Sequence, residues 1–127
     1  MIDIVDVVAK KLEDAGLTPV RLRPLKNNEE GICIRRIPSA VVATYMDGTQ
    51  EIAYLFEVYV RYLDEERAII ECETAISLIN MANLPSANGS YRFISCGIYS
   101  HTTEVERRTD GKRTYKVGFK AEIETQG

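Results

Sequence analysis

One long segment of alternating residues, Gln50 to Leu63, constrains the fold of this chain most. Apolar or aromatic side chains occupy every second position in it: Ile52, Tyr54, Phe56, Val58, Val60 and Tyr62. The intervening positions include Glu51, Glu57, Tyr59 and Arg61. Because successive side chains of a β-strand point to opposite faces of a sheet, this spacing predicts one long strand. We expect its apolar face to lie in the core.

Shorter runs before this segment predict further strands. Val41 to Tyr45 is followed by Asp47-Gly48, a dipeptide that favours a tight hairpin turn into the long strand. Ile32 to Ile37 is a β-branched run that predicts another strand. Val20 to Leu25 also alternates, but Pro24 cannot donate to a central ladder, so we expect at most a short edge strand.

The last third of the sequence predicts a second β-hairpin. Its arms run from about Tyr91 to Arg108 and from Arg113 to Thr125, and Asp110-Gly111 marks the turn. The returning arm alternates cleanly, with one face made by Tyr115, Val117, Phe119, Ala121 and Ile123. A hairpin of this length could project beyond the domain and offer an edge to a neighbouring chain.

Helical spacing of apolar residues predicts a first helix at the start of the sequence. The predicted buried stripe consists of Ile2, Val5, Val8, Leu12 and Ala15. Gly16 can adopt the left-handed conformation that ends many helices, Leu17 can make the accompanying apolar contact, and Pro19 prevents continuation.

A second helix is predicted between the long strand and the last hairpin. Asp64 is a suitable N-cap, and the helix should run to about Asn83, before Pro85. Its predicted apolar stripe consists of Ile69, Cys72, Ile76 and Ile79, with Ala68, Ala75 and Ala82 beside it. The small alanines should let this helix lie close to the sheet.

The order of these elements predicts an α+β fold. We expect an antiparallel or mixed β-sheet of about four to five strands packed by two α-helices, with a long C-terminal β-hairpin. The sequence has no βαβ alternation that would suggest a parallel sheet, and no linker divides it. Residues 1–127 are therefore expected to form a single domain, a length that can bury a stable core.

Charge and hydropathy argue against binding to nucleic acids or membranes. The net charge is -3, with 16 basic residues dispersed among 19 acidic ones, so no long-range field attracts a phosphate backbone. No apolar run approaches the roughly 20 residues that span a bilayer. The first residues include Asp3 and Asp6 where a signal peptide carries positive charge, so we expect the protein to stay in the cytoplasm.

The sequence contains no recognisable catalytic, cofactor or metal motif. His101 is the single histidine and has no nucleophile at a recognisable spacing. The three cysteines, Cys33, Cys72 and Cys96, lie far apart within apolar patterns, which predicts buried reduced thiols. We therefore predict no catalytic residue, no cofactor and no metal ligand.

Basic and aromatic residues on the polar strand faces are the candidate subunit interface. On the strands they are Arg35, Tyr59 and Arg61, and near the last turn they are Arg107, Arg108, Lys112 and Arg113. Arginine and tyrosine are enriched at protein interfaces. The alternative is that these charges only protect strand edges from aggregation, and the sequence does not decide between the two.

The order and spacing of these motifs resemble those of the tail terminator and minor capsid (neck) proteins of long-tailed bacteriophages and phage-tail-like particles. The resemblance covers nearly the whole chain. It rests on the helix ending at Ala15-Gly16, the hairpin segment 41–49, the long strand with Phe56 and Arg61, the helix from Asp64, and the turn at 110–115. None of these motifs is catalytic.

This resemblance implies a virion structural protein that acts as a subunit of a closed, six-fold ring. Such a ring caps the tail tube, ends its polymerisation and joins the tail to neck or head-completion proteins. Its partners would be further copies of the chain, the tail tube protein and a neck protein, with DNA only as cargo through the channel. The protein would reside in a virion or tail-like particle assembled in the cytoplasm of a bacterial host.

Two other classes of function stay open at the level of the sequence. A small ligand-binding or regulatory α+β module would need a concave pocket with convergent polar groups. A small enzyme would need residues that meet only in the fold, and His101 or the carboxylates could serve there.

Overall fold

The computed structural model describes residues 2–17, 20–26 and 29–126, and these contain two helices and six strands. In chain order the elements are α1 (Ile4–Asp14), β1 (Val20–Arg21), β2 (Gly31–Arg36), β3 (Ala40–Thr44), β4 (Thr49–Tyr62), α2 (Glu65–Ile79), β5 (Arg92–Arg107) and β6 (Arg113–Gln126). The predicted α+β class is confirmed.

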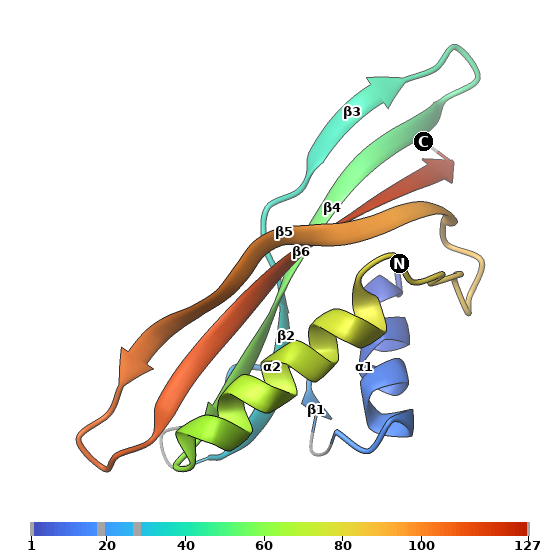
Figure 1. Cartoon of the computed structure of the whole chain (residues 1–127). Coiled ribbons are helices and arrows are strands. Elements are labelled where there is room, and N and C mark those ends of the chain that lie inside the picture. The colour runs from blue at the N-terminus through green and yellow to red at the C-terminus, as the bar shows by residue number, and fades with distance from the viewer. Residues whose placement is uncertain (1, 18–19, 27–28, 127) are drawn as a thin grey trace.

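The six strands form one mixed sheet in which β4 is central (Figure 1). The order is β1-β2-β4-β6-β5. β3 lies on the same side of β4 as β2: β3 pairs with residues 50–53 of β4, and β2 pairs with residues 56–61. All pairs are antiparallel except β1 with β2, which are parallel. The sheet thus has one strand more than expected, because the short β1 adds to its edge.

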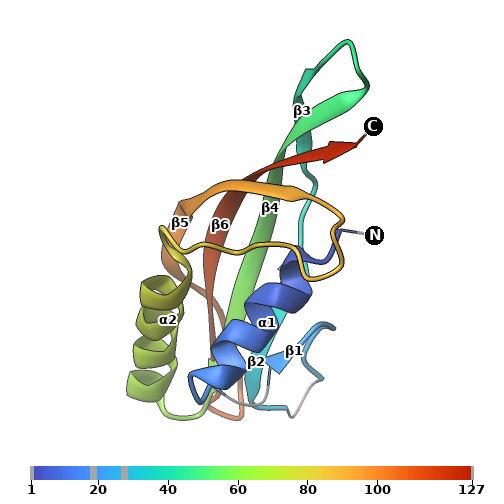
Figure 2. The same cartoon turned by 90° about the vertical axis from the view of Figure 1, so that its right-hand side faces the viewer.

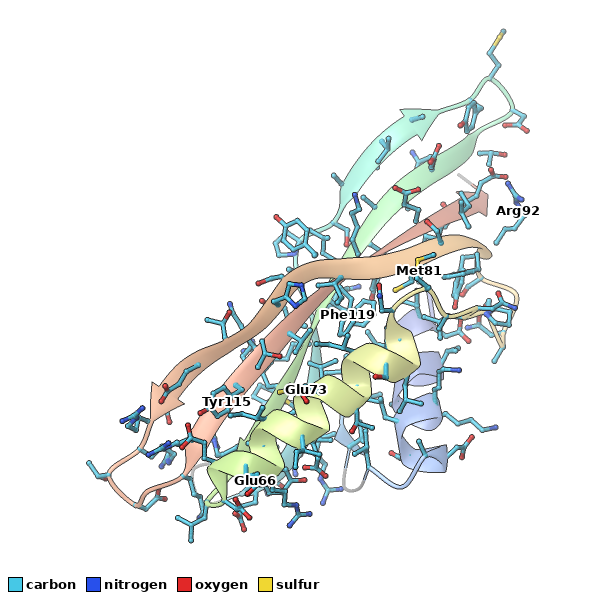
Figure 3. All side chains as sticks on the ribbon, in the orientation of Figure 1. Glu66, Glu73, Met81, Arg92, Tyr115 and Phe119 are labelled. Carbon is cyan, nitrogen blue, oxygen red and sulfur yellow. The ribbon has the colours of Figure 1, made fainter. Side chains whose placement is uncertain are left out.

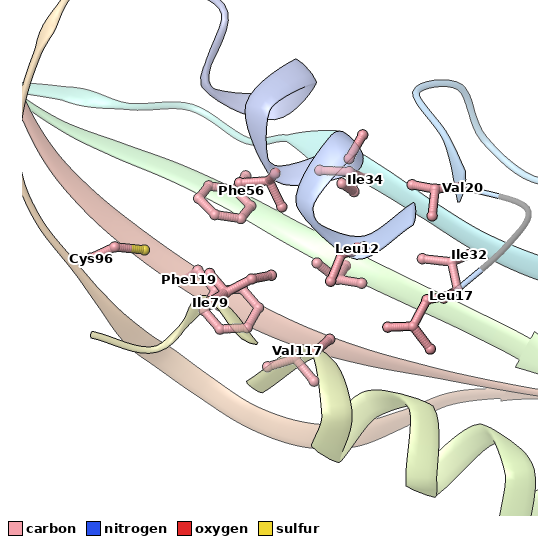
Figure 4. Packing of buried hydrophobic residues seen from close by; sticks show 14 of the residues in the cluster. Leu12, Leu17, Val20, Ile32, Ile34, Phe56, Ile79, Cys96, Val117 and Phe119 are labelled. Atoms are coloured by element: carbon pink, nitrogen blue, oxygen red, sulfur yellow. The ribbon is translucent and has the colours of Figure 1, made fainter. Parts of the chain in front are cut away.

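Both helices cover the same face of the sheet (Figure 2). The hydrophobic core lies between these helices and the sheet (Figure 4). The central strands β4 and β6, which pair along their full length, form most of the sheet side of this core. The predicted inward face of β4 is buried from Tyr54 to Tyr62, and so is that of β6 from Tyr115 to Ile123. Ile52 is only half-buried, because it lies on the β3–β4 hairpin, which extends past the helices (Figure 2).

Helix α1 ends where the sequence predicts, although its buried stripe differs. Gly16 has a φ of 94°, and the Leu17 N–H donates to the Leu12 carbonyl at 3.0 Å. This is the bond of a left-handed helix end. The buried helical residues are Ile4, Val8, Ala9 and Leu12. The expectation for Ala15 was wrong, since it follows the helix and is exposed, and Pro19 lies outside the described residues.

Helix α2 begins at its predicted cap but ends earlier than expected. The Asp64 carboxylate accepts from the backbone N–H groups of Glu66 and Arg67 at 3.0 and 3.3 Å. The helix stops at Ile79 rather than near Asn83, because Met81 takes a φ of 63° and its N–H donates to the Cys96 carbonyl of β5. Edge pairing with β5 replaces the next helical turn.

The buried stripe of α2 is rotated towards its alanines. The fully covered residues are Ala68, Cys72, Ala75 and Ile79, whereas Ile69 and Ile76 are partly buried along one side of this stripe. Small side chains at the centre let the helix lie close to the sheet. Of the isoleucines in the predicted stripe, Ile79 is fully buried, and Ile69 and Ile76 lie at its margin.

The N-terminal segment is held to the loop before β5 by Asp3. Its carboxylate accepts from the Ser86 hydroxyl at 2.7 Å, the Ser90 hydroxyl at 3.1 Å, and the backbone N–H groups of Ala87 and Asn88 at 3.0 and 3.2 Å. Burial alone would raise the pKa of Asp3, but these hydrogen bonds outweigh it and lower the pKa below its usual value.

Candidate subunit interface

The seven predicted interface residues fall into two groups. Arg35, Tyr59 and Arg61 lie on the sheet face that carries neither α1 nor α2, which we call the open face. Arg107, Arg108, Lys112 and Arg113 lie at the turn between β5 and β6. The structure thus brings three of the residues into one site and gathers four at the end of the hairpin.

The three residues on the open face line one cavity of about 160 Å³, which we call the arginine pocket. Its other walls are Pro24, Leu25, Cys33, Val105, Glu106 and Thr114. Four strands contribute, because β2, β4, β6 and β5 lie side by side here. The loop after β1 closes one side of the pocket, which is why Cys33 is buried although it faces away from the helices.

Hydrogen bonds hold Arg61 in this pocket. Its Nε donates to the Thr114 hydroxyl at 2.9 Å, and Nη1 donates to the Lys26 carbonyl at 2.8 Å. The guanidinium therefore links β4 to β6 and to the loop after β1. Neither partner carries a charge that would neutralise it.

Arg35 is placed differently, above the ring of Tyr59. Its guanidinium carbon lies 6.0 Å from the ring centroid, at the outer limit of a cation–π contact. The Tyr59 hydroxyl donates to Glu57 at 2.8 Å, and burial with this bond raises its pKa to about 12. The ring of Tyr59 is thus fixed by Glu57 and lies below the Arg35 guanidinium.

The arginine pocket carries uncompensated positive charge. Two carboxylates beside the pocket pair with other cations: Glu57, opposite Arg35 on β4, with Lys116 at 3.1 Å, and Glu106, in the pocket wall, with Arg108 at 3.0 Å. Within the described part of the chain, neither Arg35 nor Arg61 forms an ion pair. The two cations that face this hollow are therefore not held in ion pairs, although the Glu106 carboxylate belongs to the same pocket.

The end of the β5–β6 hairpin is electrostatically balanced instead. Its cations have these acidic partners: Arg107 with Glu104, Arg108 with Glu106 and Asp110, Lys112 with Asp110, and Arg113 with Glu65. The Tyr115 hydroxyl also donates to Glu65 at 2.9 Å. Glu65 belongs to the first turn of α2, so the hairpin end is tied to the helix layer.

Sequence reasoning missed a second exposed apolar surface, on the β3–β4 hairpin. Val41, Val42, Tyr45 and Met46 are exposed there, and the hairpin extends beyond both helices (Figures 1 and 2). The signal was present, because consecutive apolar residues at 41–43 put apolar groups on both faces of β3. Val105 of the arginine pocket, 48% exposed, was missed as well.

The described residues show no arrangement typical of a catalytic or metal site. Within them, no group of three or more His, Cys, Asp or Glu residues could hold a metal ion. His101 is exposed on β5. The three cysteines are free and buried as predicted, and burial raises the pKa of Cys72 to about 12 and that of Cys96 to about 11.

A larger hollow lies at the base of the β3–β4 hairpin, on the helix side. It measures about 520 Å³, is widely open, and is lined mainly by Ile2, Ile37, Pro38, Val41, Ile52 and Tyr54. Arg36 is its one charged wall. Such an open apolar surface lacks the convergent polar groups of a small-molecule site.

No helix in the described ranges is both long and apolar enough to cross a lipid bilayer.

Comparison with solved structures shows a likeness in fold. No protein-family model matches the sequence, and no curated protein matches it. Among solved structures, the chain is similar to a chain from the virion of a native gene transfer agent particle, with a TM-score of 0.57 and 14% sequence identity. The match covers 93% of this chain and 84% of the other. At this identity the likeness shows that the two chains share a fold.

Proposed function

We propose that this chain is a virion structural protein of a phage-like particle, in which it forms a ring that caps the tail tube. The ring would end tube polymerisation and join the tail to neck proteins. The observation that carries the proposal is the shared fold with a chain of a gene transfer agent virion over most of both chains. The motif order in the sequence independently resembles tail terminator proteins.

The surface of the subunit supports an assembly role. A ring needs two different patches on each subunit, placed so that one copy can bind the next by rotation. The helix layer and the open face point in opposite directions, and each carries exposed residues. The exposed apolar residues of the β3–β4 hairpin add a third surface, which we assign to a different partner, the tail tube or a neck protein.

The charge of the chain suits a channel for DNA. With a net charge of -3, a ring of these subunits would have little general affinity for a phosphate backbone, so DNA could pass as cargo. We propose six copies in the ring, a place in a virion or tail-like particle assembled in the bacterial cytoplasm, and no enzymatic activity.

Deletion of the gene tests this function directly. Without the protein, electron micrographs should show tails of uncontrolled length or tails that do not join heads, and a plasmid copy should restore normal particles. Mass spectrometry of purified wild-type particles should detect the chain. Normal, length-controlled tails attached to heads in the deletion strain would overturn the proposal. A ligand-binding module or an enzyme would leave tail geometry unchanged.

A further inference from the structure

We propose that the arginine pocket of one copy binds an acidic stripe on helix α2 of the next copy. This contact rests on the proposed ring, since it names the two surfaces through which neighbouring subunits would meet. The partner that binds the open face would then be a second copy of this chain.

The acidic stripe lies on the side of α2 that faces away from the sheet. It consists of Glu66, Ile70 and Glu73, all exposed, with Ile70 at 51% exposure. Positions four and three residues apart share one face of a helix. At about 100° per residue, this face is roughly half a turn from the buried stripe centred on Cys72. Figure 3 shows both glutamates on α2.

The two glutamates are as uncompensated as the two arginines. Within the described part of the chain, neither Glu66 nor Glu73 forms an ion pair, although Glu71 beside them pairs with Arg67. The apolar parts also match, since Ile70 lies between the glutamates while Leu25 and Val105 line the arginine pocket. The glutamates of the acidic stripe could therefore pair with the arginines of the pocket, while the apolar side chains of the two surfaces pack together.

The spacing of the charges is compatible with simultaneous pairing. Seven residues of helix separate the Cα atoms of Glu66 and Glu73 by about 10 Å. Arg35 pairs in register with Glu57, so it lies about 13 Å along the strand direction from Arg61. Both arginine side chains converge on one pocket, and this brings their guanidinium groups closer than their backbones.

The two surfaces point in opposite directions, so the contact is head-to-tail. The acidic stripe faces outward from the helix layer, and the arginine pocket faces outward from the open sheet. A contact between two different patches can propagate from copy to copy and closes into a ring if the rotation allows. Because the two patches of one copy point away from each other, a two-fold dimer could not pair both at once, and would have to bury one patch against itself and bring like charges together.

Self-association of purified protein tests the contact through charge reversal. Arg35→Glu is suitable because Arg35 is exposed and makes no hydrogen bond within the described residues, and Glu73→Arg reverses the opposite surface. Each variant alone should weaken self-association at least about tenfold at low salt, because like charges then face each other across the contact. Lys10→Glu and Glu13→Arg on the exposed side of α1 are matched controls, and they should leave it unchanged.

Mixing the two variants gives the decisive measurement. In an equimolar mixture of Arg35→Glu and Glu73→Arg, alternating copies have complementary charges at every contact, so the assembly should return. Light scattering measures the mass, and far-UV circular dichroism confirms that each variant is folded. Independently, carbodiimide treatment of an Arg35→Lys variant should couple the new ammonium group to Glu66 or Glu73 of another copy.

The outcomes separate the contact from the proposed function. Wild-type assemblies that both reversals leave intact, or a mixture that stays dissociated, would overturn this contact while the deletion phenotype still decides the role in tails. A wild-type chain that stays monomeric at high concentration would also overturn it. Binding of duplex DNA that depends on Arg35, without self-association, would assign the arginine pocket to phosphate instead.

Discussion

Phe56 and Phe119 face each other on the paired central strands β4 and β6, with ring centroids 5.5 Å apart and ring planes inclined by 23°. Both rings are completely buried beneath the helices. They join the two halves of the chain, because β4 lies before α2 in the sequence and β6 lies near its end.

Truncating either ring should therefore threaten the whole fold. We expect Phe56→Ala to lower the free energy of unfolding by about 3–5 kcal/mol, since it removes a large buried side chain and leaves a cavity. That is a large part of the roughly 5–15 kcal/mol that stabilises a typical domain. Urea unfolding followed by circular dichroism measures the loss. Tyr99→Ala on the exposed side of β5 is the control, and an equal loss there would contradict the central role of Phe56.

The Asp3 cluster should make stability depend on acidity. Asp3→Asn weakens the charge-assisted bonds from the loop at 86–90, and we expect a loss of about 1–3 kcal/mol near neutral pH. Because the folded-state pKa lies below the usual 3.8, this stability is present above about pH 4 and is lost as pH falls through the folded pKa. The gap between wild type and variant should close in acid. Asp6→Asn, on the exposed side of α1, should show no such gap.

The buried cysteines should not react with thiol reagents in the native protein. Only the thiolate reacts readily, and burial raises the pKa of all three thiols. We expect a disulfide reagent at pH 8 to label none of them before unfolding and all three in guanidinium chloride. Rapid labelling of Cys33 in the native state would show that the loop beside the arginine pocket opens.

Glu65 should keep the end of the β5–β6 hairpin on the helix layer. Glu65→Ala removes the partner of both Arg113 and the Tyr115 hydroxyl. Because the pair is partly exposed, we expect a global loss within about 1 kcal/mol. Hydrogen exchange at residues 104–114 should nevertheless become faster. Unchanged exchange there would mean that strand pairing alone holds the hairpin end.

The cations at the hairpin end should matter less for assembly than Arg35. Arg107 and Arg108 already have acidic partners in their own chain, so replacing both by Gln should weaken self-association less than Arg35→Gln does. Sedimentation velocity of the two variants makes the comparison. A larger effect at the hairpin end would favour the interface that the basic residues near the last turn predict from the sequence.

The sequence by itself determined the elements whose signals are local. Period-2 alternation predicted β4 and β6, Asp-Gly dipeptides predicted both hairpin turns, and the C-terminal end of α1 and the start of α2 followed from Gly16 and Asp64. Each of these depends on residues within a few positions of one another, so the chain carries the information without its tertiary contacts.

Only the tertiary structure decided which residues meet across the sheet. The order β2-β4-β6-β5 brings Arg35, Arg61 and Val105 into one pocket, although 70 positions separate the first from the last. It also ended α2 at Ile79, since pairing of Met81 with β5 competes with the next helical turn. Charge pairing also depends on the tertiary structure: among the described residues Arg107 forms an ion pair, with Glu104, whereas Arg35 forms none.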